Sequence, residues 1–550
     1  MKIVIIGGVA GGATAAARAR RMSESAEITL IERGPYVSFA NCGLPYFISG
    51  EISRRSHLLL QTAEGFDSRY GVKVHLNTEA LEIDRKGKQV RTMGEEGEKW
   101  FDYDKLILAQ GGNPILPPMP GSDAEHAFKL WTIPDMDRIQ SYIKIQKPET
   151  AIVAGGGFIG LEMAEAFHAR GLKVTVVELA PQLMSVMDRE FGERIKLQLE
   201  DNGISVEVGV GLKAILSETK EVELSDGRKL PADLVLFSVG VRPELTLAKQ
   251  ADLTLGESGG VLVDSMLKTS DPDIYAAGDM TEVVQKVSGR KVRIPLAGPA
   301  NRQGRIAASN ALGASMVYKG ALGTSVVKLL DATAASTGLT EKGARDSGFD
   351  TGVSIIHKDH HAGYYPGGKE LTLKLVYDKK NGRLLGAQAF GMEGVEKRID
   401  VLATALQGKM TVEDLSELDL AYAPPYSSAN DPVNMAAFVA MNNLSGFSPT
   451  VTDEEAAALY KSETAFILDV RNLGEYERAH VKGSANIPVD ELRSRLGEVP
   501  KGKTTIVYCA VGFRGHLAVR ILKDNGYTSV YNITGGYTSM RMTHSFEEEN

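Results

Sequence analysis

The two cysteines of this 550-residue chain both lie in settings that suit sulfur chemistry. Cys42 lies in the segment Ser38–Tyr46, shortly after a predicted strand, glycine loop and helix. Cys509 follows the apolar segment Thr504–Tyr508, a predicted strand, and opens the loop Ala510–Gly515. A free cysteine is often only a small buried hydrophobe. The flanking segments here favour thiols that move sulfur or electrons.

Composition narrows the classes of function. The net charge is −8, so the chain lacks the basic excess that nucleic-acid binding requires. Two cysteines cannot make a disulfide framework, which predicts a reducing cytoplasm. We find no run of 18 apolar residues, and the first strand is too short for a signal-peptide core. We therefore expect no membrane, nucleic-acid or metal partner.

A complete dinucleotide fingerprint, Gly-x-Gly-x-x-Gly, stands between a predicted strand, Ala151–Ala154, and a predicted helix, Leu161–Arg170. Such glycines form the turn, let the pyrophosphate approach the backbone, and pack helix on strand. The next predicted strand, Lys173–Glu178, ends in an acid that can bind a ribose 2′-hydroxyl and would repel a 2′-phosphate. This favours NADH, with NADPH left open. The residues assigned to the site are Gly155, Gly157, Phe158, Ile159, Gly160, Glu178 and Gly240.

An earlier copy of the same unit begins with a predicted strand, Lys2–Ile6, and a helix, Gly12–Met22. Its loop departs from the fingerprint, because Val9 takes the place of the second glycine. Far downstream, Thr269–Asp279 reads as a strand that ends in Gly-Asp and resembles the second FAD motif of two-dinucleotide flavoproteins. This predicts FAD at the first site. The residues assigned to it are Gly7, Gly8, Val9, Ala10, Gly11, Gly12, Glu32, Arg33, Ala80, Gly111 and Asp279.

Over about residues 1–445 the chain resembles the pyridine nucleotide–disulfide oxidoreductases. The usual members carry two cysteines on the first helix, whereas here Ala13–Arg21 has none and Cys42 stands alone. That arrangement is similar to the single-cysteine branch of coenzyme A disulfide reductases, NADH oxidases and NADH peroxidases, which shares the Val9 departure. Gly7–Thr14 and Ser38–Cys42 look closest to the coenzyme A disulfide reductases. The segments 361–366 and 422–428 resemble that branch too.

Residues 451–550 resemble a single-domain rhodanese. The resemblance rests on five segments: Leu468–Arg471, Glu475–Tyr476, His480–Pro488, Cys509–Arg514 and Gly535–Tyr537. The whole chain is therefore similar to fusions of a coenzyme A disulfide reductase with a rhodanese, some of which are described as NADH-dependent persulfide reductases.

These resemblances imply an α/β fold with two Rossmann-like dinucleotide-binding domains, an α+β dimerisation domain and a rhodanese-like domain. The expected boundaries are 1–114 with 245–325 for FAD, 115–244 for NAD(P)H, 326–445 for dimerisation and 451–550 for the rhodanese. We also expect a homodimer.

The resemblance also implies roles for individual residues. Cys42 has no neighbouring cysteine, so it pairs with a substrate sulfur or is oxidised to a sulfenic acid. Tyr364 and Tyr422 match tyrosines that reach the active site from the partner subunit, although such tyrosines are as often structural. Cys509 carries sulfane sulfur, with Arg514 adding charge, unless the module serves only for binding. The residues expected to contact coenzyme A are Thr14, Arg18, Arg21, Ser38, Asn41 and Arg69. A solvated basic face is the alternative for the arginines.

Three functions are compatible with these patterns. The leading hypothesis is reduction of coenzyme A disulfide, coenzyme A persulfide or polysulfide by NADH through FAD and Cys42. The second is an NADH oxidase or peroxidase with a Cys42 sulfenic acid. The third is a redox-sensing or sulfur-carrier protein that docks another protein.

Overall fold

The computed structural model describes residues 1–462 and 464–549, which form two compact units. The first unit contains Met1–Pro181 and Glu200–Gly323. The second contains Gln182–Leu199 and the chain from Thr324 onward.

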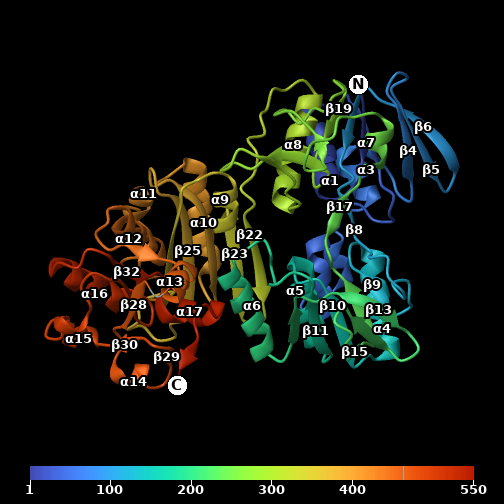
Figure 1. Ribbon diagram of the computed structural model, residues 1–550. Helices are drawn as coiled ribbons and strands as arrows, with labels where there is room; N and C mark the ends of the chain where they lie inside the picture. The colour runs from blue at the N-terminus through green and yellow to red at the C-terminus, as the bar shows by residue number, and fades with distance from the viewer. Residues whose placement is uncertain (463, 550) are drawn as a thin grey trace. The chain divides into compact units, whose positions relative to one another are not determined.

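The first parallel sheet of the first unit has the order β19-β7-β1-β2-β3. The apolar run of β1 places four of its five residues in the core, as expected for a central strand covered on both faces. In Figure 1 the green β19 and α8 lie beside the blue N-terminal elements, although they are distant in sequence. The elements are β1 (Lys2–Ile6), α1 (Ala10–Met22), β2 (Glu27–Ile31), β3 (Val72–His75), β7 (Lys105–Leu108), β19 (Ile274–Ala276) and α8 (Ala297–Ala311).

A second parallel sheet, of order β12-β11-β10-β16-β9, repeats this arrangement. In both sheets the next strand in sequence lies on one side of the first strand, and the sheet continues on its other side. Such a reversal of strand order leaves a crevice at the carboxyl ends of the strands, where dinucleotides bind. The elements are β9 (Ala127–Lys129), α4 (Ile133–Gln146), β10 (Thr150–Ala154), α5 (Phe158–Ala169), β11 (Lys173–Glu178), β12 (Ser205–Val208) and β16 (Leu234–Phe237).

The two chain segments that leave these sheets pair with each other. Strand β8 (Gly112–Pro114) runs antiparallel to β17 (Val241–Pro243). Smaller elements complete the unit: α2 (Leu44–Ser49), α3 (Ala63–Tyr70), β4 (Glu79–Asp84), β5 (Gln89–Gly94), β6 (Gly97–Asp102), β13 (Leu212–Leu216), β14 (Glu221–Leu224), β15 (Lys229–Pro231), α7 (Thr246–Gln250), β18 (Val261–Leu262), β20 (Thr281–Val284) and β21 (Lys291–Val292).

The second unit holds an antiparallel sheet of order β22-β23-β26-β25-β24. Its strand β23 has the small-residue sequence ATAASTG, which lacks a strand pattern. The elements are α6 (Arg189–Asp201), β22 (Ser325–Leu329), β23 (Ala332–Gly338), α9 (Glu341–Asp346), β24 (Thr351–Asp359), β25 (Glu370–Asp378), β26 (Leu384–Gly391), α10 (Val395–Gly408), α11 (Val412–Ser416) and α12 (Pro432–Leu444).

Helix α6 is joined to this sheet by a buried ion cluster. The Lys374 ammonium lies 2.9 Å from Asp188, 2.5 Å from Glu190 and 2.8 Å from a carboxylate oxygen of Glu341. These charges hold the pKa of Lys374 well above its ordinary value, although burial by itself would lower it. The cluster explains why Gln182–Leu199 belongs to the second unit.

A parallel sheet of order β27-β32-β31-β28-β30 forms the C-terminal part of the second unit. Its helices and strands alternate along the chain, so the mixed α/β architecture predicted from the sequence is confirmed. The elements are β27 (Thr450–Val451), α13 (Asp453–Lys461), β28 (Ala465–Asp469), α14 (Leu473–Tyr476), β29 (His480–Val481), β30 (Ala485–Asn486), α15 (Val489–Leu492), β31 (Thr504–Tyr508), α16 (Phe513–Asp524), β32 (Val530–Ile533), α17 (Gly536–Thr543) and β33 (Glu548–Glu549).

Within the described residues, no helix has both the length and the apolar character that crossing a membrane requires.

Candidate functional site

The two glycine loops have the same backbone construction. A side chain added at Gly12 would place its Cβ 1.7 Å from the carbonyl oxygen of Gly7, and at Gly160 the corresponding approach to Gly155 is 1.9 Å. Only glycine therefore lets each helix begin so close to its strand. At Gly157, by contrast, no described residue beyond the adjacent backbone places an atom within 4 Å of such a Cβ. That open space beside the N-terminus of α5 suits an approaching pyrophosphate.

An acidic residue at the end of the second strand closes each loop in the same way. Glu32 accepts hydrogen bonds at 2.7 Å from the backbone N–H groups of Gly8 and Gly34. Glu178 accepts them at 2.7 Å from Gly156 and Ala180. Burial raises the pKa of Glu32, and the two N–H donors oppose that shift. Both acids are thus held beside their glycine loops, where a ribose of a bound dinucleotide would lie.

The other residues assigned to the two loops lie around them. Val9 is the N-cap of α1 and Ala10 its first residue, while Phe158 and Ile159 open α5. Gly11 is buried on α1, and Ala80 lies in β4. The remaining three residues lie beside the antiparallel pair β8–β17. The carbonyl of Gly111 accepts from the N–H of Glu244 at 2.9 Å, and the carbonyl of Gly240 accepts from the N–H of Ile115 at 2.9 Å. Arg33 donates to the Asn113 side chain at 3.2 Å.

Asp279, predicted to hold the ribityl chain, follows β19 and Gly278. No described residue donates a hydrogen bond to its carboxylate in this structure, and burial raises its pKa to about 6. A desolvated carboxylate without a partner is unfavourable unless a ligand hydroxyl binds it. The position therefore fits a polyhydroxy chain.

Cys42 lies in a short 3₁₀ segment, Asn41–Gly43, directly before α2. Its thiol is free and exposed. The Asn41 side-chain oxygen accepts from the Cys42 N–H at 3.1 Å and lies 3.7 Å from the sulfur. The N–H of Ser38 donates to the carbonyl of Gly8 at 2.7 Å, so this segment is attached to the first glycine loop.

Desolvation by the surrounding atoms raises the pKa of the Cys42 thiol, and the negative charges of Glu162 and Asp279 add to this effect. Glu162 lies on α5 and accepts a hydrogen bond from Tyr46 on α2 at 3.2 Å. Burial raises the pKa of Glu162 to about 7. Sequence reasoning missed Glu162, because nothing in the local pattern shows that α5 packs against α2.

We expect Glu162→Gln to lower the pKa of Cys42. The wild-type carboxyl is charged above about pH 7 and disfavours the thiolate there, whereas the glutamine amide is neutral at every pH. Alkylation of Cys42 by iodoacetamide should therefore be about threefold faster in the variant at pH 8, which is about half a pKa unit. Below pH 6 the two rates should converge, because the wild-type carboxyl is then protonated. Mass spectrometry of the Cys42 peptide after reduction measures the rates.

Glu165→Gln is the matched control, because it removes the same charge one turn further along α5. Its charge raises the pKa of Glu162 and of Tyr46, whereas the charges that raise the pKa of Cys42 are those of Glu162 and Asp279. A rate profile of Glu162→Gln that coincides with wild type at every pH, or an equal acceleration in Glu165→Gln, would contradict this role of Glu162.

Some of the residues predicted to bind coenzyme A form hydrogen bonds within the chain, and others are exposed to solvent. On α1, Thr14 donates to Asn301 at 2.9 Å and Arg18 donates to Ser309 at 2.9 Å, both on α8. Arg21 is exposed, and so is Arg69 on α3, a helix that packs against α1. Both helices thus carry an exposed arginine at the surface of the first unit.

The tyrosine pair lies in the second unit. The hydroxyls of Tyr364 and Tyr422 are 2.9 Å apart, and this hydrogen bond raises the pKa of Tyr364. Tyr364 is 75% exposed and Tyr422 46%. This exposure leaves both phenols available to another molecule.

Cys509 lies at the end of β31 and is 1% exposed. Its sulfur accepts hydrogen bonds from the backbone N–H groups of Gly512 at 3.2 Å and Gly515 at 3.4 Å. Helix α16 begins directly after Gly512. Amide dipoles and a helix N-terminus in this arrangement stabilise a negatively charged sulfur.

Arg514 donates two hydrogen bonds to the Glu475 carboxylate, at 2.6 and 2.8 Å. This pairing lowers the pKa of Glu475 to about 2 and raises that of Arg514, with a smaller contribution from Cys509. The sequence predicts Arg514 as the charge beside Cys509. Glu475, which orients it, was not assigned a role because the two residues are far apart in sequence.

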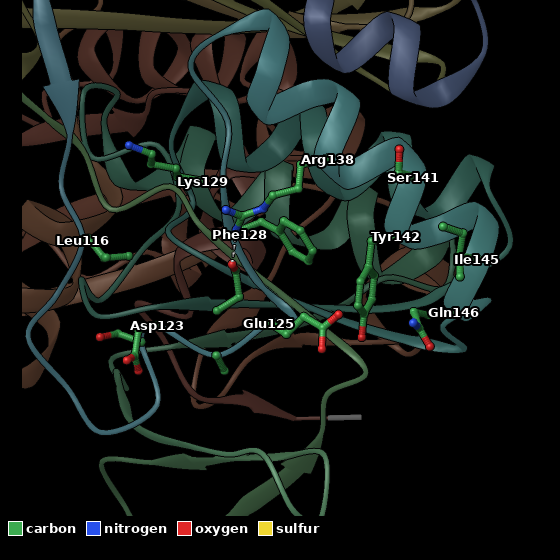
Figure 2. Close-up of a pocket in the computed structure, with 13 residues that line it drawn as sticks. Leu116, Asp123, Glu125, Phe128, Lys129, Arg138, Ser141, Tyr142, Ile145 and Gln146 are labelled. Atoms are coloured by element: carbon green, nitrogen blue, oxygen red, sulfur yellow. Dashed lines mark hydrogen bonds between the residues drawn. The ribbon is translucent and has the colours of Figure 1, made fainter.

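A separate cavity of about 500 Å³ lies against the edge strand β9 and helix α4. Figure 2 shows Phe128, Arg138 and Tyr142 facing it, and the Arg138 guanidinium lies 4.8 Å from the centre of the Phe128 ring. None of the site residues predicted from the sequence lines this cavity. The candidate sites are the loops and cysteines described above.

Three family models match most of the chain. Residues 1–304 match the model of the pyridine nucleotide-disulphide oxidoreductases, 324–432 that of their dimerisation domain, and 452–543 that of rhodanese-like domains. A crystal structure called reduced CoADR-RHD from Bacillus anthracis is 43% identical, covers 98% of both chains, and has a TM-score of 0.96.

Two further proteins are similar over most of their length. A structure of an NAD-dependent persulfide reductase from A. fulgidus is 38% identical, covers 98% of this chain and 100% of its own, and has a TM-score of 0.91. The NAD(P)H coenzyme A polysulfide/persulfide reductase of Pyrococcus horikoshii is 36% identical over 80% of this chain and 98% of its own. The resemblance inferred from the sequence is thereby confirmed, and the chain belongs to the pyridine nucleotide-disulphide oxidoreductase family.

Proposed function

We propose that this protein is an NAD(P)H-driven, FAD-dependent reductase of coenzyme A disulfide and coenzyme A persulfide or polysulfide, whose rhodanese domain carries sulfane sulfur. The observation that carries the proposal is the free, exposed Cys42 thiol, the sole cysteine of residues 1–508. Without a partner cysteine, the second sulfur of a redox-active disulfide must come from the substrate.

The residues present fit both dinucleotides. At the first site, the unpaired Asp279 carboxylate suits the ribityl chain of FAD, and the first glycine loop suits its pyrophosphate. At the second, Glu178 would bind the ribose hydroxyls of NADH and disfavour the 2′-phosphate of NADPH. When bound, FAD would take a hydride from the nicotinamide and supply two electrons to sulfur.

The reduction of a disulfide would proceed on Cys42. Its thiolate attacks one sulfur of coenzyme A disulfide, the S–S bond breaks, and one coenzyme A thiolate leaves. The resulting mixed disulfide of Cys42 and coenzyme A is reduced by the electron pair from NADH. Cys42 is thereby returned as a thiolate, and the second coenzyme A takes up a proton and leaves as a thiol.

Coenzyme A carries a 3′-phosphate and a pyrophosphate, which require cationic partners. Arg21 and Arg69 are exposed on adjoining helices and would bind these groups, with Arg18 and Thr14 along the same face of α1. Ser38 and Asn41 would contact the thiol end, because they flank Cys42. The exposed Tyr364–Tyr422 pair would enter the active site of a partner subunit in a homodimer and protonate a leaving thiolate.

The rhodanese domain would supply sulfane sulfur. A persulfide on Cys509 is an anion, and the amides of Gly512 and Gly515, with Arg514 nearby, would stabilise it. Reduction of a coenzyme A persulfide by one NADH yields coenzyme A and sulfide. The rhodanese domain would thus supply the sulfane sulfur, and Cys42 would take part in the reduction of the resulting coenzyme A persulfide.

Mass spectrometry of the purified protein tests the proposal. We expect a fraction of the chain to carry, on Cys42, the mass of coenzyme A less two hydrogen atoms, and dithiothreitol to remove it. The physical reason is that the mixed disulfide between Cys42 and coenzyme A persists when no NADH is present to reduce it. A Cys42 found only as sulfenic or sulfinic acid, with fast NADH-dependent oxygen consumption, would instead support the NADH oxidase alternative.

A further inference from the structure

A turn of the rhodanese domain is joined to the edge of the antiparallel sheet in the same unit. The outer edge of β24 presents the backbone of Ile355, whose N–H donates to the Thr534 hydroxyl at 2.8 Å. The same hydroxyl lies 3.4 Å from the Ile355 carbonyl. Both residues are buried, so the turn after β32 covers the free edge of the sheet.

His357, two residues further along β24, makes a second connection. Its Nε2 atom lies 2.9 Å from the Ser539 hydroxyl on α17. Its Nδ1 atom lies 2.8 Å from the Thr372 hydroxyl and 3.4 Å from an Arg194 N–H. A guanidinium can only donate, so Nδ1 accepts and Nε2–H donates to Ser539. Burial, with Arg194 nearby, lowers the pKa of His357 to about 3, which keeps the ring neutral.

The residues between these two connections hold the Cys509 loop. The N–H of Tyr537 donates to the Cys509 carbonyl at 2.8 Å, and that of Thr538 donates to the Ala510 carbonyl at 3.0 Å. A Cβ at Gly536 would lie 2.4 Å from the Cys509 carbonyl oxygen, and its φ of +61° also favours glycine. Thr534 and Ser539, which contact the sheet, therefore flank the backbone that clamps the sulfur-bearing strand end.

We propose that His357 is a positioning residue for the backbone amides that surround the Cys509 sulfur. The rhodanese site then includes part of the antiparallel sheet to which β24 belongs. This rests on the proposed sulfur-carrying role of Cys509. The hydrogen bond from His357 fixes Ser539 and the start of α17, and α17 in turn fixes the carbonyls of Cys509 and Ala510. The N–H groups of Gly512 and Gly515 keep their hydrogen bonds to the sulfur only while the backbone of Cys509 and Ala510 stays in this position.

The test uses the full-length holoenzyme and three changes at the connection. His357→Leu removes the donor, Ser539→Ala removes its acceptor with little change in volume, and His357→Gln restores an N–H donor. Lys523→Met is the matched control, because it removes a different hydrogen bond of the same domain, from the Lys523 ammonium on α16 to the carbonyl of Gly446.

Two measurements are made on each variant. Hydrogen exchange with mass spectrometry follows the amides of residues 509–516. Sulfurtransferase activity follows sulfur transfer from thiosulfate to cyanide, in which the Cys509 thiolate takes the outer sulfur, sulfite leaves, and cyanide then removes that sulfur as thiocyanate. We expect faster exchange and about a tenfold lower kcat in His357→Leu and Ser539→Ala. His357→Gln should recover most of the loss, and Lys523→Met should match wild type.

Unchanged exchange and kcat in both His357→Leu and Ser539→Ala would overturn the inference, as would an equal effect of Lys523→Met. Failure of the proposed function has a different signature. If Cys509→Ser keeps wild-type sulfurtransferase activity, or the wild type has none, the sulfur-carrying role is wrong, and the exchange of residues 509–516 alone decides whether His357 holds the loop.

Discussion

Cys42→Ser is expected to abolish NADH-driven reduction of coenzyme A disulfide, with kcat at least about 10³-fold lower than in wild type. A serine hydroxyl neither attacks a disulfide at neutral pH nor forms a mixed disulfide with coenzyme A. The thiol is exposed, and the one side-chain hydrogen bond found for it among the described residues is to the adjacent Asn41, so the substitution should leave the fold unchanged. The measurement is coenzyme A thiol release under anaerobic conditions.

The same variant should still bind FAD and pass a hydride to it. The glycine loops, Glu178 and Asp279 are untouched, so NADH should bleach the flavin absorbance at nearly the wild-type rate. That half-reaction is the internal control. Disulfide reduction at more than a few per cent of the wild-type rate in Cys42→Ser would contradict the thiol mechanism. A wild-type oxygen consumption that exceeds thiol release would favour the oxidase alternative.

Cys509→Ser should abolish sulfur transfer from thiosulfate and weaken reduction of larger sulfane donors. We expect the sulfurtransferase kcat to fall at least about 10³-fold, because the amide cradle would then hold a group that cannot form a persulfide. Reduction of coenzyme A disulfide should stay within about twofold of wild type, since it requires Cys42 alone.

Both activities, sulfur transfer from thiosulfate and reduction of coenzyme A disulfide, should be measured in one preparation. Their comparison decides whether Cys509 and Cys42 carry out separate reactions. An equal loss of both activities in Cys509→Ser would show that the two cysteines act in one obligatory sequence. Cys42→Ser provides the reciprocal measurement, because it should keep the sulfurtransferase activity that Cys509→Ser loses. Both variants should show wild-type flavin content.

Local patterns predicted the dinucleotide loops well, and the reason is steric. The glycine spacing around Gly12 and Gly160 is set by the contact of a helix N-terminus with the preceding turn, which involves residues close in sequence. The strands Lys2–Ile6, Lys173–Glu178 and Thr504–Tyr508 have the bounds predicted for them. Strand β23 was missed, because its small residues carry no alternation and its place depends on pairing with β22 and β26.

The electrostatics around each sulfur were not predictable, because the responsible groups come from distant segments. Glu162 acts on Cys42 through the packing of α5 on α2, and Glu475 orients Arg514 across 39 positions. The free exposure of Tyr364 and Tyr422 likewise depends on their surroundings. Each of these follows from burial and charge in the folded chain.

The sequence by itself determined the family and located the two glycine loops and the two cysteines, because these depend on short segments whose chemistry is local. The tertiary structure decided which groups control those sulfurs. It placed a carboxyl with a pKa of about 7 near Cys42, and it joined the Cys509 loop through α17 to His357 of another sheet. Desolvation and hydrogen-bond geometry arise only when distant segments pack together, so no local pattern carries them.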